Sequence, residues 1–167
     1  TTVDTTAPTL ISSTPADDAT AVAIDSNIVL TFAEEVSVAT GNITIKKSSD
    51  DSTVETIDVT SGQVTGTGTT EITINPIADL EESTEYYVQI DATAIDDAAG
   101  NSYAGISDIT TLSFKTFDTI DPYLSSSAPA DDASAVAIDS DIILTFTEAV
   151  DVESGNIVIY KASDNSV

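Results

Sequence analysis

The chain has 167 residues, of which 29 are Asp or Glu and 4 are Lys, and it contains no Arg, His, Cys, Met or Trp. Its net charge is therefore 4 − 29 = −25. Without His and Cys, the usual zinc sites, thiol nucleophiles and His-based catalytic triads are excluded. A chain this acidic and without Arg is not expected to bind nucleic acid. No apolar run approaches the ~20 residues that a transmembrane helix needs.

Hydrophobic residues make up 41% of the chain, and most of them follow a period of two. High net charge alone favours disorder, but β-branched residues that alternate with polar ones are typical of half-buried strands. The sequence therefore predicts an acidic globular protein. Its self-repulsion must be tolerated through salt screening, bound cations or both.

Strands are predicted along most of the first 117 residues, and turn signals such as Pro15-Ala16-Asp17-Asp18 and Gly100-Asn101 separate them. The regular alternating segments are 28–32, 42–46, 71–75, 86–91 and 111–115, and less regular strands are expected near 9–13, 20–24, 54–59 and 63–66. The only helix-like stretch, 78–84, is expected to form one short turn that crosses between sheets. About seven strands with one apolar face each predict an all-β fold, a seven-stranded β-sandwich.

An internal repeat has an offset of 124 − 10 = 114 residues. Residues 9–53 and 123–167 align without gaps and are identical at 29 of 45 positions. We therefore predict a domain organisation of an N-terminal linker at 1–8, a complete domain at 9–117, an interdomain linker at 118–122, and the first three strands or so of a second domain at 123–167.

The second copy stops where the first has completed about three strands. A sandwich cut at that point lacks the strands that cover its core, and its sheet edges lie open. Two interpretations stay open: the chain is a piece of a longer tandem array, or a neighbouring chain supplies the missing strands. An odd strand number places entry and exit at opposite poles, so copies are expected to join end to end. Pro122 should make the joint short and stiff.

Several segments, taken together, suggest a family. They are Asp4–Pro8, Ser13–Ala19, Ile28–Glu34, Ile74-Asn75-Pro76 leading to Leu80, Thr84-Glu85-Tyr86, Ile95–Asn101 and Leu112–Thr116. This set resembles the bacterial immunoglobulin-like domains of surface-layer proteins and giant repeat adhesins. The resemblance implies an immunoglobulin-like sandwich in an extracellular, cell-surface array that presents a binding tip or builds a coat or filament. Many such arrays bind calcium at their domain joints.

Calcium is also the chemistry that the acidic residues themselves suggest, because a hard cation needs several converging oxygens. Loops in a seven-stranded sandwich alternate between two poles, and this divides the candidate ligands into two sets. One set is Asp4, Glu34 in the expected 33–40 loop, and Asp96, Asp97 and Asn101 in the expected 92–109 loop. The other, at the joint, is Asp118, Asp121 and Glu148, approached by Asp25, Asp79, Glu81 and Glu82. The alternative is that these residues simply occupy exposed turns.

The predicted function is that of a non-catalytic spacer module in an extracellular tandem-repeat adhesin, stiffened by calcium at its joints. Its expected partners are neighbouring repeats of the same chain. One alternative is a subunit of a surface layer or extracellular filament, completed by strands of a neighbouring copy. A second alternative is a carbohydrate- or protein-binding accessory module, which needs an exposed aromatic platform in a chain where only 5% of residues are aromatic.

Overall fold

The computed structural model describes residues 3–163 and 166. All regular secondary structure in this part of the chain is β, and none of it is helical. The chain divides into two compact units, Thr1–Thr119 and Ile120–Val167, which are taken one at a time below. Two residues of the predicted N-terminal linker (1 and 2) and three of the predicted second domain (164, 165 and 167) lie outside the described residues.

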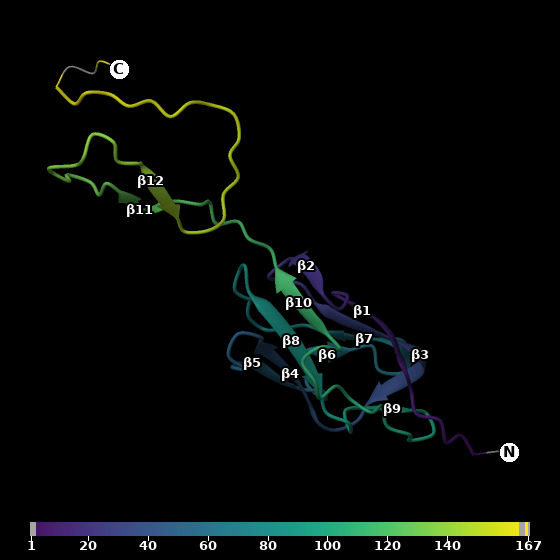
Figure 1. The fold of residues 1–167 in the computed structure, drawn as a ribbon. Coiled ribbons are helices and arrows are strands. Elements are labelled where there is room, and N and C mark those ends of the chain that lie inside the picture. The colour runs from purple at the N-terminus through teal and green to yellow at the C-terminus, as the bar shows by residue number, and fades with distance from the viewer. Residues whose placement is uncertain (1–2, 164–165, 167) are drawn as a thin grey trace. The chain divides into compact units, whose positions relative to one another are not determined.

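The first unit is a sandwich of two five-stranded sheets (Figure 1). One sheet has the order β1-β3-β7-β6, with β9 also paired to β3, and the other has the order β2-β10-β8-β4-β5. The strands are β1 (Leu10–Thr14), β2 (Ala19–Val22), β3 (Ile28–Val38), β4 (Asn42–Lys47), β5 (Thr53–Asp58), β6 (Val64–Thr65), β7 (Thr69–Ile74), β8 (Glu85–Ile90), β9 (Ile95–Asp97) and β10 (Ser113–Thr116). The all-β sandwich predicted from the apolar alternation is confirmed.

The unit has more strands than the seven or so predicted for the sandwich, although nine of its ten strands coincide with segments that the alternation predicted. The two N-terminal strands lie in different sheets: β1 pairs antiparallel with β3, whereas β2 pairs parallel with β10. Pro15, which has no backbone N–H to donate, lies in the turn between them. The strand that was not predicted is β9, which three residues of the expected 92–109 loop form by pairing with the end of β3. The short β6, predicted near 63–66, pairs with β7.

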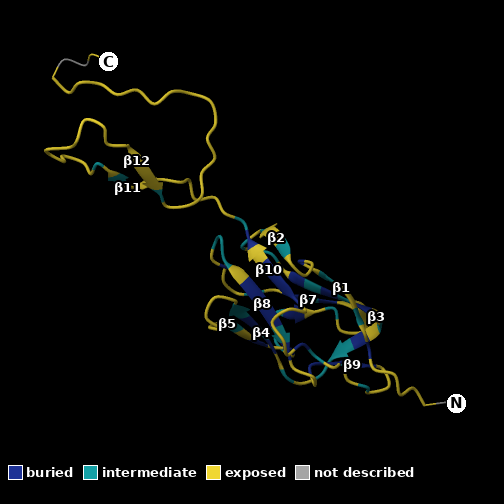
Figure 2. Ribbon diagram, in the orientation of Figure 1, coloured by how far each residue is buried: buried dark blue, intermediate teal, exposed yellow. Residues whose placement is uncertain are grey.

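The core lies between the sheets and consists of the apolar residues that the alternation places on one face (Figure 2). Ile28, Leu30 and Phe32 of β3 are all buried, and so are Ile43 and Ile45 of β4. The remaining buried apolar side chains come mainly from β7, β8, β10 and the segment around β9. These strands therefore present one apolar face inward, as expected for a sandwich.

The stretch 78–84 is not helical, contrary to the prediction of a short helical turn. Side chains from the neighbouring strands satisfy its backbone instead. The Tyr86 hydroxyl accepts a hydrogen bond from the Glu81 N–H at 2.9 Å. The Thr116 hydroxyl donates to the Glu81 carbonyl at 2.7 Å and accepts from the Thr84 N–H at 3.0 Å. With these partners, the segment crosses between the sheets without a helical hydrogen-bond ladder.

The second unit contains one antiparallel pair among its described residues, β11 (Leu124–Ala128) with β12 (Ile143–Phe146). The register repeats that of β1 and β3: Leu10 faces Phe32 in the first unit, and Leu124 faces Phe146 in the second. The irregularity in the pairing recurs at the equivalent place, after Leu10 and after Leu124. The apolar residues of this unit are mostly exposed, in contrast to their counterparts in the first (Figure 2).

Candidate functional site

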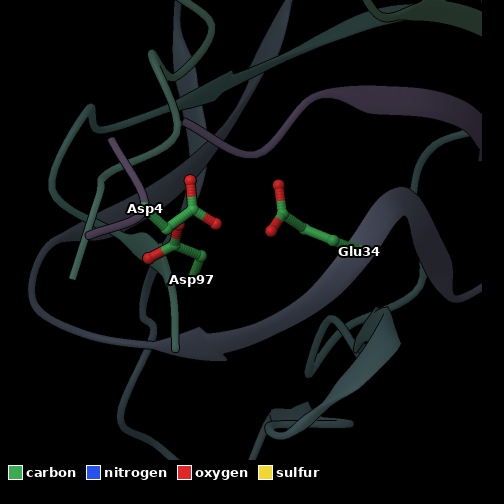
Figure 3. A group of neighbouring side chains, drawn as sticks. All are labelled: Asp4, Glu34 and Asp97. Carbon is green, nitrogen blue, oxygen red and sulfur yellow. The ribbon is translucent and has the colours of Figure 1, made fainter. Parts of the chain in front are cut away.

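Three carboxylates meet at the end of the first unit where the chain enters the sandwich. Asp4 precedes β1, Glu34 lies on β3 and Asp97 ends β9, and one oxygen from each lies within 4.8 Å of the others. Figure 3 shows Glu34 pointing toward Asp4, with the Asp97 carboxylate beside that of Asp4. Together with Glu35, Ala98 and Ala99 they line a surface depression. Among the residues that the structure describes, this is the one such group of possible metal ligands.

The carboxylate of Asp97 is held in place by hydrogen bonds from the turn that follows it. The N–H groups of Ala99 and Asn101 each donate to Asp97 Oδ1 at 2.8 Å. The Asn101 side-chain amide donates to Asp97 Oδ2 at 2.7 Å. These bonds, led by the one from the Asn101 side chain, hold the pKa of Asp97 below its ordinary value. Asp97 therefore remains ionised at neutral pH although it is only 6% exposed.

The segment before β1 is tied to the same turn. The Asn101 Nδ2 atom lies 3.3 Å from the Asp4 carbonyl oxygen and donates to it. The Asp4 side chain accepts a hydrogen bond from the Thr6 N–H at 3.0 Å. Asn101 thus contacts both the entering chain and Asp97, so the prediction that Asp4, Asp97 and Asn101 share a pole agrees with the geometry.

Glu34 reaches the group from a strand and not from the predicted 33–40 loop, which is a correction. β3 continues to Val38 because Val36, Ser37 and Val38 pair with Asp97, Asp96 and Ile95. Its pairing with β7 has an irregularity between Thr31 and Val36, and Glu34 falls within that interval. The strand thereby presents a carboxylate toward β9 where a regular ladder would continue.

Asp96 does not join the group. Neighbouring residues on a strand point to opposite faces of the sheet, and Asp96 precedes Asp97 on β9. Its Cα faces Ser37 across the pairing with β3. Its Oδ1 atom is buried, with no hydrogen-bond partner among the described residues. Of the two adjacent acids predicted as ligands, the structure therefore selects Asp97.

The second predicted set, at the joint, is not brought together within the first unit. Asp25 and Asp79 line one polar pocket, together with residues 75–78. Glu81 is paired with Lys47 at 2.7 Å, and Glu82 accepts from the Thr119 hydroxyl at 2.7 Å.

Asp118 belongs to the first unit, whereas Asp121 and Glu148 belong to the second. The two units are described separately, so a cation site made from these three residues stays a prediction.

Among the described residues, no lysine forms an ion pair with any of the three carboxylates. Lys47 instead pairs with Glu81, with Nζ and Oε1 2.7 Å apart. Like charges at this separation repel one another, and in proteins a bound cation commonly offsets such repulsion. The donors are all oxygens, which suits calcium or magnesium and disfavours soft metals.

Sequence reasoning missed the role of Asp17 and Asp18, which it treated as turn residues only. Their carboxylates contact Ser113 on β10, which is 96 residues from Asp17 and 95 from Asp18 in sequence. No local pattern indicates a partner so distant. The single available signal was that both acids recur in the second copy, as Asp131 and Asp132.

The comparisons with known proteins identify the family. The family model for the bacterial Ig-like domain matches residues 4–116 and again residues 118–167. No curated protein matches the chain.

Among the described residues, no helix is long and apolar enough to cross a bilayer.

Two solved structures are similar to this chain. CopC from Methylosinus trichosporium OB3b is similar at 15% identity and a TM-score of 0.48, over 70% of this chain and 99% of CopC. The S-layer protein rSbsC(31-844) is similar at 15% identity and a TM-score of 0.43, over 73% of this chain. The match spans only 16% of that S-layer protein.

The family assignment rests on the sequence matches, because together they cover nearly all of the chain in two consecutive blocks. The observed sandwich, with its first strand divided between two sheets, is compatible with an immunoglobulin-like fold. The chain belongs to the bacterial immunoglobulin-like domain family.

Proposed function

We propose that the chain is a non-catalytic spacer module of an extracellular, tandem-repeat cell-surface adhesin, and that calcium bound by Asp4, Glu34 and Asp97 stiffens each joint. The observation that carries this proposal is the convergence of these three carboxylates where the chain enters the domain. The site joins the segment before the domain to the domain itself. A cation there would hold the entering chain against β3 and β9.

The spacer role is supported by how the chain passes through the first unit. It enters beside β3 and β9, and β10 ends at the opposite end of the sandwich (Figure 1). Consecutive copies built this way would extend along an axis. Two consecutive matches to the same family model and the 114-residue offset support an array of such copies.

Calcium is supported by the chemistry of the donors. Calcium takes 6–8 oxygen ligands from carboxylates, carbonyls and water. Asp4 and Glu34 can each supply up to two oxygens and Asp97 can supply Oδ2, because Asp97 Oδ1 already accepts two backbone N–H bonds. Water would supply the remaining ligands. The repeat extends the argument, because Asp4 and Glu34 have counterparts at 4 + 114 = 118 and 34 + 114 = 148, which are Asp118 and Glu148.

A carbohydrate-binding role is less well supported for the first unit. Such a site needs an exposed aromatic ring on which a sugar can stack. The three tyrosines of the first unit, Tyr86, Tyr87 and Tyr103, are all buried. They serve the core, as in the edge-to-face contact of Tyr103 with Phe32, whose ring centroids are 5.3 Å apart.

Thermal melting of the full chain in calcium, in magnesium and in chelator tests the proposal. A free calcium concentration a hundredfold above the dissociation constant should stabilise the first unit by about 2.7 kcal/mol. Glu34→Gln keeps the side-chain shape and removes one charge, so most of the calcium-dependent shift in Tm should disappear. Glu71→Gln makes the same change on the exposed part of β7 and should retain the full shift. A wild-type Tm that is equal in excess calcium and in chelator would remove calcium from the account.

A further inference from the structure

The first unit has one sheet edge that is both long and regular, and it is formed by β5. The other edges are short or irregular: β6 and β9 have two and three residues, the β1 pairing is irregular after Leu10, and β2 contains Ala21 with a φ of 56°. Such features protect an edge from further pairing. By contrast, β5 has six residues at the end of its sheet, and its register with β4 is unbroken from Glu55 to Asp58.

The hydrogen-bond pattern shows which backbone groups of this edge are free. The Val59 N–H donates to the Gly41 carbonyl at 3.1 Å, and these two residues continue the register of the β4–β5 pair. In an antiparallel pair, only every second residue bonds to the neighbouring strand. Residues 55 and 57 therefore bond to β4, whereas the N–H and C=O of Thr56 point away from it. The Thr56 side chain is exposed as well.

Two copies of β5 can pair through this edge about a two-fold axis at Thr56. The two Thr56 residues then face each other, and each N–H donates to the carbonyl of the other. Asp58 faces Val54 of the second copy, and Glu55 faces Ile57. No carboxylate of one strand lies directly opposite a carboxylate of the other, which is the arrangement that disfavours cross-strand pairing.

The charges beside the two ends of β5 also fit this arrangement. Lys46 faces Thr53 at the start of β5, and it lies on the same face of the sheet as Asp58 at the end. The two-fold axis places the start of one strand beside the end of the other, so each Lys46 approaches Asp58 of the second copy. Asp58 contributes only its N–H to the pairing, because its carbonyl accepts from the Ser61 N–H at 3.0 Å.

We propose that a second copy of this chain pairs antiparallel with the free edge of β5, so that two five-stranded sheets become one continuous sheet. The pairing adds lateral association to the spacer role. Its purpose, to join neighbouring arrays side by side, rests on the proposed function, whereas the association itself is a property of the single chain. Because each copy carries a net charge of −25, added salt should strengthen the pairing.

Sedimentation equilibrium of the full chain tests the pairing, in chelator and at about 0.1 M and about 1 M NaCl, where the Debye length is about 10 Å and about 3 Å. The mean mass should rise with protein concentration from 17.2 kDa toward twice that value, and it should rise further in the higher salt. Thr56→Pro removes the central N–H on the side away from β4, which an edge strand tolerates. It should weaken the dimer at least about tenfold, whereas Thr56→Val keeps the N–H and should pair like the wild type.

Thr56→Lys gives a second test that keeps the whole backbone. It places two like charges opposite each other at the axis and should also weaken the dimer. A wild type that keeps the mass of a single chain at every concentration and in both salts would overturn the proposal. So would a Thr56→Lys chain that dimerises as tightly as the wild type, since association would then use another surface.

Disulfide formation tests the register. The chain has no native cysteine, and facing residues of a hydrogen-bonded antiparallel pair have Cα atoms about 5.5 Å apart, which a disulfide can span. Oxidised Thr56→Cys should therefore form a covalent dimer. Thr44→Cys is the matched control, because Thr44 faces Thr56 from β4 and the two copies of it would lie three strand spacings apart, about 14 Å. Equal cross-linking of both variants would overturn the register, and that failure would leave the calcium-dependent melting of the first unit unchanged.

Discussion

The two units contain nearly the same sequence in different surroundings. Ile43 and Ile45 of β4 have no exposed surface, whereas Ile157 and Ile159, 114 residues later, are 84% and 66% exposed. β4 is paired on one side with β5 and on the other with β8. The segment 156–161 of the second unit is not a strand, and the described residues of this unit include no strand that pairs with it. The comparison teaches that β4 is a strand because of its partners more than because of its own alternation.

Some backbone angles are nearly the same in both units because they are set mainly by nearby residues. Asp18 and Asp132 both have φ of 58°, and Gly41 and Gly155 have φ of 132° and 138°. The Gly position requires the absence of a side chain in the first unit, where an added Cβ would lie 2.9 Å from the Asp91 Cβ. The β11–β12 pair forms because both of its strands lie within the same 25 or so residues, as short-range pairing requires.

The largest expected effect is a difference in the free energy of unfolding between alanine variants of two equivalent isoleucines, Ile45 and Ile159. Ile45→Ala should lower the free energy of unfolding of the first unit by about 2–5 kcal/mol, since it leaves a cavity in a close-packed core. Ile159→Ala removes the same atoms from an exposed side chain and should change stability by less than about 0.5 kcal/mol. Urea denaturation of the full chain measures both. Similar costs for the two variants would mean that the second unit has a packed core of its own.

A smaller effect concerns a turn that only the first unit contains. Asp108 accepts hydrogen bonds from the N–H groups and hydroxyls of Thr110 and Thr111 at 2.8–3.1 Å. These bonds, led by the Thr110 N–H, lower the pKa of Asp108 from 3.8 to about 2. Because the folded pKa lies below the unfolded one, the stabilisation is complete above the unfolded value and is lost as pH falls toward about 2.

Comparison of the wild type with Asp108→Asn across that pH range checks this expectation. The wild type should have the higher Tm at neutral pH, and the difference should shrink as pH falls from 3.8 to about 2. A difference that stays constant through this range would show that the charge of Asp108 does not stabilise the turn. The transition observed should be that of the first unit, because the described residues of the second unit bury little apolar surface.

The fold class and the core were predictable because they depend on alternation, which each strand carries in its own residues. The positions of Ile28, Leu30 and Phe32 follow from that rule alone. The two N-terminal strands were predicted, but the pairing of β2 with β10 was not, because β10 is about 95 residues away in the sequence. β9 was not predicted because a strand of three residues is too short to give a periodic signal.

The sequence predicted which end of the sandwich holds the candidate site, but not which side chains converge there. Alternating loops placed Asp4 near the turn of Asp97 and Asn101, and the structure agrees. The choice between Asp96 and Asp97 requires knowing that this segment is a strand, because only then do the two side chains point to opposite faces. The position of Glu34 depends on an irregularity in the β3–β7 pairing. The residues of β3 alone do not predict that irregularity.

The central claim is that the 114-residue repeat forms a sandwich only when all of its strands are present. Without the partner strands, a segment such as 156–161 stays exposed and does not form a strand. The direct measurement is amide hydrogen exchange at residues 156–161 in a chain extended after Val167 with a copy of residues 54–117. In that chain the segment should become a strand, and its exchange should slow at least about a thousandfold, as expected for a core strand that opens only by global unfolding. Exchange as fast as in the unextended chain would contradict the claim.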